Sequence, residues 1–181
     1  MRKFILITTL LISGSSLFAQ RKVTTSATVN FDATTNMDAL PKAENKTVIG
    51  ALNTETGTLQ FEANVKNFEF RNPTMQGHFN SAKWMDSDQF PKMTFSGKIA
   101  DLSKVNFKKD GTYQVPITGD LTVKGTSKSL ASTATIIIKG DVIQASAAFS
   151  IKVADYGIAN VSIESGKVAR EPKVTVSAEF K

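Results

Sequence analysis

The pattern that decides the fold is Leu59-Gln60-Phe61-Glu62-Ala63-Asn64-Val65-Lys66. Apolar side chains occupy every second position, and polar side chains fill the positions between them. Because successive side chains of a β-strand point to opposite faces, this period predicts a strand with one buried face and one solvated face. The turn residues 53–57 precede it, so we expect a hairpin whose other strand includes residues 48–52.

The same alternation recurs along most of the chain. It is visible in the segments that begin at Val23, Met93, Tyr113, Leu130, Val142 and Val174. The pattern predicts an all-β protein of about eight antiparallel strands, which must hide their apolar faces between two sheets or inside a closed barrel. Alternation alone leaves both architectures open, and it also leaves open whether side chains fill the interior or surround a cavity.

Four places interrupt the alternation. Polar residues 32–46 predict a loop with one helical turn, and the change of phase between Val65 and Phe68 predicts a bulge near Asn67. Pro116 cannot donate to a sheet ladder, so we expect a sheet edge, a bulge or a strand break there.

The fourth interruption predicts a short helical insertion at about 72–91. Asn72 before Pro73 is a favourable helix start, and apolar residues follow at helical spacing.

The N-terminus has the order of a secretory signal peptide. Basic residues 2–3 precede a mostly apolar stretch at 4–12, and small residues lead to a predicted cleavage site after Ala19. A membrane-spanning helix needs about 20 predominantly apolar residues, so a retained anchor is the weaker interpretation. We therefore expect a signal peptide at 1–19, one domain at 20–181, and a periplasmic or secreted location.

Composition excludes several classes of function. The chain has no cysteine, which excludes disulfides and thiolate metal sites. Its net charge of +6 is spread along the sequence and forms no basic stripe of the kind that binds nucleic acid. The single histidine, His78, has no ligand spacing around it, and no Gly-x-Ser-x-Gly motif follows the signal peptide. We expect no enzyme activity, no metal and no cofactor; an undetected hydrolase would lose activity on substitution of His78 by alanine.

Several motifs carry a resemblance to a known family. The segments 75–80 (Met-Gln-Gly-His-Phe-Asn) and 85–95 (Met-Asp-Ser-Asp-Gln-Phe-Pro-Lys-Met-Thr-Phe) resemble the YceI-like family, and segments 47–57, 119–128 and 149–158 agree with it. The resemblance implies a single lipocalin-like barrel of eight antiparallel strands that holds a polyisoprenoid or similar amphiphile in its lumen. The Asp155-Tyr156-Gly157-Ile158 segment looks most like members from the Bacteroidetes.

We predict that the inward faces of these strands and the insertion bind the lipid. The predicted lumen residues are Phe61, Phe68, Phe79, Trp84, Met93, Phe95, Val115, Ile117, Phe149 and Ile151. By the family pattern His78 lies near the barrel mouth, where it would contact a lipid head group, although a histidine that satisfies backbone carbonyls is the more ordinary case.

Two other functions remain open at this point. A filled-core interaction module would carry no ligand. A small outer-membrane barrel would turn its apolar faces outward, but two tyrosines and one tryptophan are few for two aromatic girdles. We predict no membrane span after cleavage, and a homodimer is compatible with the sequence.

Overall fold

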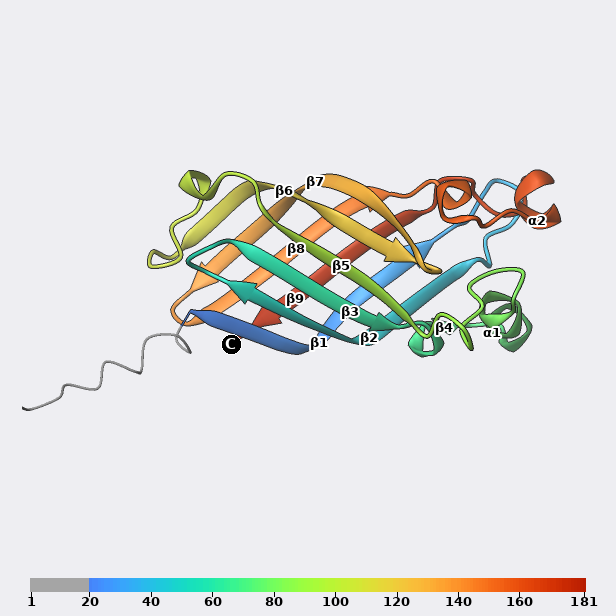
Figure 1. Ribbon diagram of the computed structural model, residues 1–181, viewed down its shortest axis with the longest axis horizontal. Coiled ribbons are helices and arrows are strands. Elements are labelled where there is room, and N and C mark those ends of the chain that lie inside the picture. Colours follow the sequence, from blue (N-terminus) through green and yellow to red (C-terminus); the bar gives the residue numbers. More distant parts are fainter. Residues whose placement is uncertain (1–19) are drawn as a thin grey trace, which may run out of the picture.

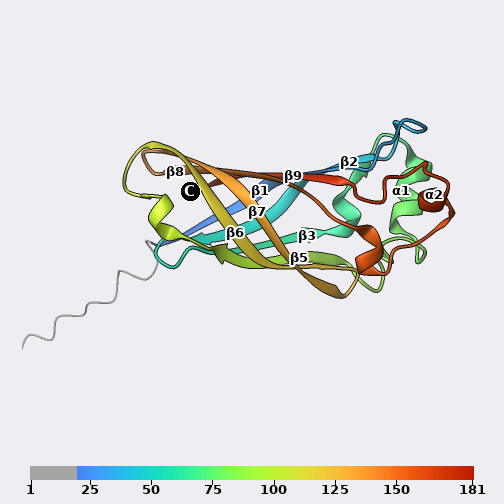
Figure 2. The ribbon, with the colours of Figure 1, turned by 90° about the horizontal axis from the view of Figure 1, so that it is seen from above.

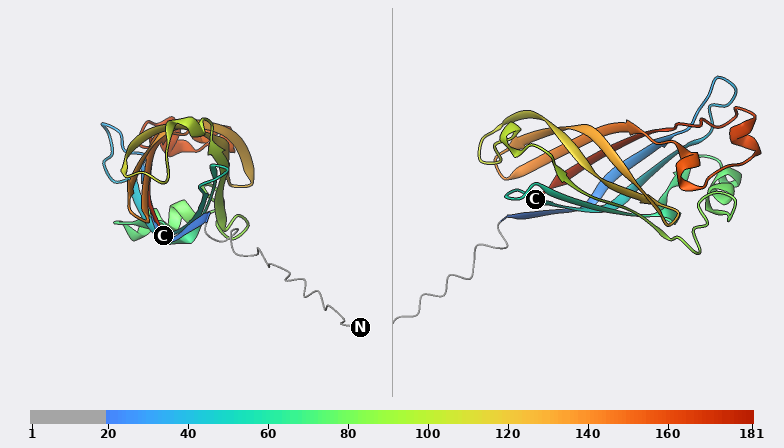
Figure 3. Two further views of the ribbon diagram at one scale, coloured as in Figure 1. Left: turned by 90° about the vertical axis from the view of Figure 1, so that its left-hand side faces the viewer. Right: turned by 45° about the horizontal axis from the view of Figure 1, so that its top comes forward.

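The computed structural model describes residues 20–181 of the chain, so the predicted signal peptide lies outside the described residues. Nine strands form one sheet in the order β1-β9-β8-β7-β6-β5-β3-β2-β4, and β1 also pairs with β2. This last pairing closes the sheet into a barrel, which Figure 1 shows from the side and Figure 3 shows end-on. The predicted barrel is therefore confirmed, and a two-sheet sandwich is excluded.

All strand pairings are antiparallel. Strand β4 has two residues and pairs with β2 beside the barrel wall, so eight long strands make the barrel. The strands are β1 (Arg21–Asp32), β2 (Lys42–Asn53), β3 (Thr58–Asn64), β4 (Glu69–Phe70), β5 (Lys92–Ile99), β6 (Gly111–Val123), β7 (Thr126–Lys139), β8 (Val142–Ser150) and β9 (Lys173–Phe180).

Short helices lie between the strands. They are the α-helices α1 (Pro73–Asn80) and α2 (Val161–Glu164) and the 3₁₀ helices η1 (Val65–Asn67), η2 (Leu102–Lys104) and η3 (Val153–Tyr156). Both α-helices lie at one end of the barrel, and the C-terminus and the start of β1 lie at the other (Figures 1 and 2). None of the helices within residues 20–181 is long and apolar enough to cross a membrane.

Helix α1 starts where the sequence predicts. The Asn72 side chain accepts a hydrogen bond from the Thr74 main-chain N–H at 2.9 Å, and Pro73 occupies the first helical position, where its missing donor costs nothing. The helix ends at Asn80, and turns continue to Gln89. The predicted helical insertion is thus confirmed for residues 73–80.

The predicted loop at 32–46 is wrong in its second part. Strand β2 begins at Lys42, which pairs with Asp32 of β1, and Ala43 pairs with Phe31. The inward residues of this part of β2 are the small Ala43 and the polar Asn45, both buried. Since neither is a large apolar residue, this half of the strand lacks the alternation that identifies the other strands.

Register shifts invert the predicted phase at the start of β1. Val23 is 49% exposed, whereas its neighbour Thr24 is only 6% exposed. The pairing with β2 shifts between Thr24 and Ala27 and again between Ala27 and Val29. A shift of one residue moves a side chain to the other face of the sheet, so Val23 lies outside the barrel.

The other two interruptions have local causes. The change of phase after Val65 is produced by the 3₁₀ turn η1, which allows both Val65 and Phe68 to be buried. The Pro116 carbonyl accepts from the Ala100 N–H at 2.8 Å, just beyond the end of β5. Pro116, which has no N–H to donate, therefore lies where β6 extends past the end of β5. This part of β6 is a local sheet edge, one of the three predicted alternatives.

Candidate ligand-binding cavity

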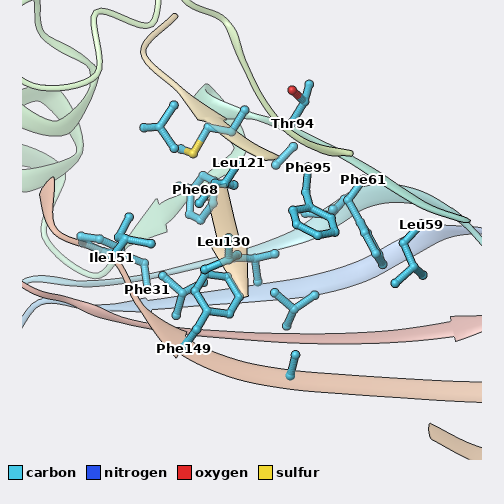
Figure 4. Close-up of a pocket in the computed structure, with 18 of the residues that line it drawn as sticks. Phe31, Leu59, Phe61, Phe68, Thr94, Phe95, Leu121, Leu130, Phe149 and Ile151 are labelled. Carbon is cyan, nitrogen blue, oxygen red and sulfur yellow. The ribbon is translucent and has the colours of Figure 1, made fainter. Parts of the chain in front are cut away.

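The barrel interior holds an apolar cavity of about 160 Å³. Strands and connecting segments on all sides contribute to its lining, and Figure 4 shows the side chains converging on it. The inward side chains of the lining are apolar, and none carries a titratable group; Thr94 and Ser146 alternate with inward residues of β5 and β8 and turn their side chains away from the cavity. Such a cavity offers no hydrogen-bond partners to water, and cavities of this kind stay dry and accept apolar ligands.

The cavity does not extend through the whole barrel. At the end that carries the C-terminus, buried side chains from several strands pack against one another and lie outside the lining: Leu52, Ile99, Val115, Ile136, Ile138, Ile143 and Phe180. The barrel is therefore filled at this end, and a ligand has room only toward the end that carries α1 and α2.

The segment 73–91 covers the cavity at the α1 end. Phe79 of α1 is buried, and its ring centroid lies 6.1 Å from that of Phe31, 5.8 Å from Phe68 and 5.0 Å from Phe70. Trp84 and Met85 line the cavity from the turns after α1. This aromatic contact attaches the insertion to β1, β4 and the residue that follows η1.

Polar contacts hold the same segment from outside. The Lys124 ammonium donates to the Ala82 carbonyl oxygen at 2.9 Å, and Lys66 pairs with Asp88 at 2.6 Å. Both lysines are at least partly exposed to solvent, and exposed ion pairs stabilise by only about 0–1 kcal/mol. The segment is thus held mainly by the apolar side chains that face the lumen.

Comparison with known families identifies the chain. A family model described as a YceI-like domain matches residues 13–180. The chain belongs to the YceI-like family. No curated protein matches it.

Solved structures of YceI-like and related proteins share the barrel. A polyisoprenoid-binding domain from Saccharophagus degradans is 14% identical, covering 90% of this chain and 98% of that one, with a TM-score of 0.75. BcnA of Burkholderia cenocepacia is 19% identical over 91% of this chain and 98% of that one, with a TM-score of 0.64. The Campylobacter jejuni YceI protein is 18% identical over 100% and 99%, with a TM-score of 0.53. At these identities the likeness establishes the fold.

The structure brings together most of the residues predicted for the lumen of this YceI-like protein. Those that line the cavity are Phe61, Phe68, Phe79, Trp84, Met93, Phe95, Ile117, Phe149 and Ile151. Val115 does not line it. Val115 lies two residues before Ile117 on the inward face of β6, but it is fully buried in the filled end of the barrel. Alternation identifies the face of a strand, whereas packing across the barrel decides where the cavity ends.

His78 lies away from the cavity of this YceI-like protein. It is exposed on α1, outside the lining, while the adjacent Phe79 is buried. Neighbouring residues on an α-helix point about 100° apart, so a helix that turns Phe79 inward cannot do the same with His78. The His78 side chain therefore does not line the cavity, and its predicted contact with a lipid head group stays a prediction; its main-chain carbonyl accepts from the Ser81 N–H at 3.1 Å.

Some lining residues were missed by the sequence reasoning. Those in phase with named residues of β3, β6 and β8 are Leu59, Ala63, Leu121, Ala145 and Ala147. Strands β1 and β9 contribute Val29, Phe31, Val174 and Val176, although no lumen residue was predicted on these two strands. Leu130 is the lining residue at the start of the β7 alternation. Val153 continues the alternation of Phe149 and Ile151 and was left out as well. Ile158 carried no such signal, because it lies after η3, where alternation ends.

Titratable chemistry is sparse around this cavity. Within residues 20–181 no group of three or more histidine, cysteine or acidic residues lies close enough to hold a metal ion. Tyr156 is buried in η3, and burial, followed by the nearby Asp155 carboxylate, raises the pKa of its hydroxyl. The lining thus offers apolar contact and no group that would transfer a proton.

Proposed function

We propose that this protein is an exported carrier that holds the chain of a polyisoprenoid or another long-chain amphiphilic lipid in its barrel. The observation that carries the proposal is the apolar cavity, which is closed at one end by packed side chains and has no titratable group in its lining. A methylene group gains about 0.8 kcal/mol when it moves from water to such surroundings. A long apolar chain therefore has a driving force to enter, and no covalent step is implied.

The lining is able to adapt to a chain longer than the cavity now accommodates. Met85 of the covering segment and Met93 of β5 both line the cavity, and methionine is unbranched and changes rotamer easily. The inward side chains of the lining are apolar and offer no hydrogen-bond partner to a head group. The polar head group of an amphiphile would accordingly stay outside the lumen, at the end that carries α1 and α2.

Relatives and the sequence support this proposal. The similar domain from Saccharophagus degradans is described as polyisoprenoid-binding. The predicted signal peptide at 1–19 would deliver the mature protein to the periplasm or the outside, for lipid transport, storage or a stress response. The likeness to members from the Bacteroidetes stays a prediction. We propose that the protein has no catalytic role. The mass of the native protein will also show whether it forms a homodimer.

Native mass spectrometry of the mature protein from a periplasmic extract tests the proposal. We expect release by osmotic shock, a stoichiometric lipid on the protein, and its identification after organic extraction. Trp84 is the only tryptophan in the chain and lines the cavity, so its fluorescence should change when delipidated protein is titrated with geranylgeraniol. A protein that carries no lipid and does not respond to geranylgeraniol would be a filled-core interaction module.

The structure bears on the outer-membrane alternative as well. In a membrane-spanning barrel the apolar side chains face outward and the lumen is polar. Here the buried apolar residues and the apolar cavity lie inside the barrel. The outward-facing positions of β7 and β9 carry polar side chains instead, among them Thr133, Thr135, Thr175 and Ser177. Retention in the membrane fraction after osmotic shock would nevertheless contradict our proposal.

A further inference from the structure

Two phenylalanines of the cavity wall have unusual neighbours. Phe61 of β3 and Phe95 of β5 are direct cross-strand partners, and both line the cavity (Figure 4). The ring of Phe61 lies against Gly50 of β2: a methyl group on Gly50 would come within 2.6 Å of Phe61 Cε1. The ring of Phe95 lies against two glycines, because methyl groups on Gly97 and Gly119 would come within 2.6 Å and 2.8 Å of its Cζ atom.

All three glycines belong to the inward face of the barrel. Gly50 pairs directly with Phe61, and Gly97 pairs with Gly119 two residues along β5 from Phe95. Antiparallel partners point to the same side of a sheet, as do residues two apart on a strand. Each ring therefore occupies the space that an inward side chain at the glycine would fill, so the rings extend along the wall and leave the centre of the lumen open.

The two rings are also turned away from each other. Phe61 extends over β2 and reaches Phe180 of the filled end, with ring centroids 6.0 Å apart at an interplanar angle of 65°. Phe95 extends over β5 and β6. Without the glycines, two adjacent aromatic side chains would project into the lumen from the same level of the wall. The width of the cavity at this level thus depends on glycine at three positions.

We propose that Gly50, Gly97 and Gly119 are specificity-determining positions, which set the bore of the lumen by allowing Phe61 and Phe95 to lie flat against the wall. The inference rests on the proposed lipid-binding function and adds to it the residues that decide how wide a chain can enter. These glycines contact no ligand themselves. They act through the two phenylalanines, and a larger residue at any of them narrows the bore.

Gly50 allows the sharpest test of the three. The three atoms nearest to a methyl group at Gly50 all belong to side chains, those of Phe61 and Thr24. A methyl group at Gly97 or Gly119 would instead also meet main-chain oxygen atoms, of Thr118 and Ser96 respectively. The substitution Gly50→Ala therefore moves a ring, whereas Gly97→Ala would disturb the ladder between β5 and β6.

The experiment compares Gly50→Ala with two further variants. Gly77→Ala makes the same chemical change on exposed helix α1, where a methyl group has no neighbour within 4 Å. The double variant Gly50→Ala/Phe61→Leu replaces the displaced ring by a smaller side chain. Affinity for geranylgeraniol is measured by Trp84 fluorescence on mature protein, and urea unfolding checks that each variant is folded.

We expect Gly50→Ala to weaken binding by about tenfold, since a hydrophobic pocket discriminates a single methylene by about 10–200-fold. Gly77→Ala should bind like the unaltered protein, and the double variant should recover most of the affinity. Equal affinity of Gly50→Ala, or no recovery in the double variant, would overturn the inference.

Xenon uptake separates this inference from the proposed function. Apolar cavities bind xenon whatever their natural ligand is. We expect crystals under xenon pressure to show less xenon beside Phe61 in Gly50→Ala than in the unaltered protein. If the unaltered protein binds xenon but no isoprenoid, the proposed function fails and the xenon comparison still decides the role of Gly50. Equal xenon occupancy in both proteins would show that Gly50 does not set the bore.

Discussion

The side-chain amide of Asn45 donates a hydrogen bond to the main-chain carbonyl oxygen of Asn64 at 3.0 Å, inside the barrel wall. Asn45 is fully buried, and its Oδ1 atom accepts from both the N–H and the hydroxyl of Thr47 at 2.9 Å. The residue joins β2 to the end of β3 at the point where η1 begins. A fully buried amide whose donor and acceptor are both satisfied stabilises this junction, because burial without these hydrogen bonds would be costly.

We predict that Asn45→Ala destabilises the protein by about 1–3 kcal/mol, the cost of leaving buried polar groups unsatisfied. Urea unfolding of mature protein measures the change. Asn36→Ala is the matched control, because Asn36 is exposed in the loop before β2 and should change the free energy of unfolding by less than about 0.5 kcal/mol. Equal stability of the two variants would contradict the role given to Asn45.

Phe79 should determine how firmly α1 is attached to the barrel. Its ring contacts Phe31, Phe68 and Phe70, so Phe79→Ala removes all three contacts and should cost about 3 kcal/mol. Hydrogen exchange of the amides in residues 73–80 should accelerate more than exchange in β6 and β7. Phe79→Leu retains much of the apolar volume and should show a smaller effect. Unchanged exchange in Phe79→Ala would mean that other contacts hold the insertion.

Val115 and Ile117 should separate stability from lipid binding. Val115 lies in the filled end and Ile117 lines the cavity, on the same face of β6. We predict that Val115→Ala costs about 2 kcal/mol in unfolding free energy and leaves lipid affinity unchanged. Ile117→Ala should weaken geranylgeraniol binding by about tenfold, since the chain loses contact with the wall. A loss of affinity in Val115→Ala would place the end of the lumen deeper in the barrel.

Tyr156 should make the protein less stable at alkaline pH. Burial, with a further contribution from Asp155, raises the pKa of the Tyr156 hydroxyl above its ordinary value of 10.0 in the folded state. The unfolded chain therefore loses this proton first, and the folded state loses stability as the pH rises through about 10 and above. Below that pH the Tyr156 hydroxyl is neutral in both the folded and the unfolded state, so its ionisation does not reduce the stability of the fold.

Urea unfolding from about pH 8 to about pH 11 measures this effect. The difference in stability between the unaltered protein and Tyr156→Phe should be constant up to about pH 10 and then change in favour of the variant, which has no hydroxyl to ionise. A difference that does not vary with pH would show that the pKa of Tyr156 is the same in both states.

In the insertion, the sequence predicts where helix α1 starts but not which of its faces packs against the barrel. Asn72 before Pro73 predicts the helix start, since capping and the proline ring act within one turn. The orientation of that helix is a tertiary matter: contacts with Phe31, Phe68 and Phe70 turn Phe79 inward and leave His78 exposed. Helical spacing alone groups Met75, His78 and Phe79 together and therefore cannot tell which of them faces the barrel.

Strand β1 shows the corresponding limit for alternation. Period-two patterning locates β1, but the register shifts at Thr24 and Ala27 turn Val23 outward. A bulge depends on how two distant segments pair, and the single strand carries no sign of it.

The sequence by itself determined the strands, the antiparallel class and most of the inward positions, because these follow from side-chain periodicity and turn chemistry within a few residues. Tertiary structure alone decided that the sheet closes between β1 and β2, that one end is filled around Val115 and Phe180, and that a cavity remains beside Phe61 and Phe95. The physical reason is that a cavity is the space left after all inward side chains have packed. At Phe61 that packing depends on Gly50, which lies on a different strand.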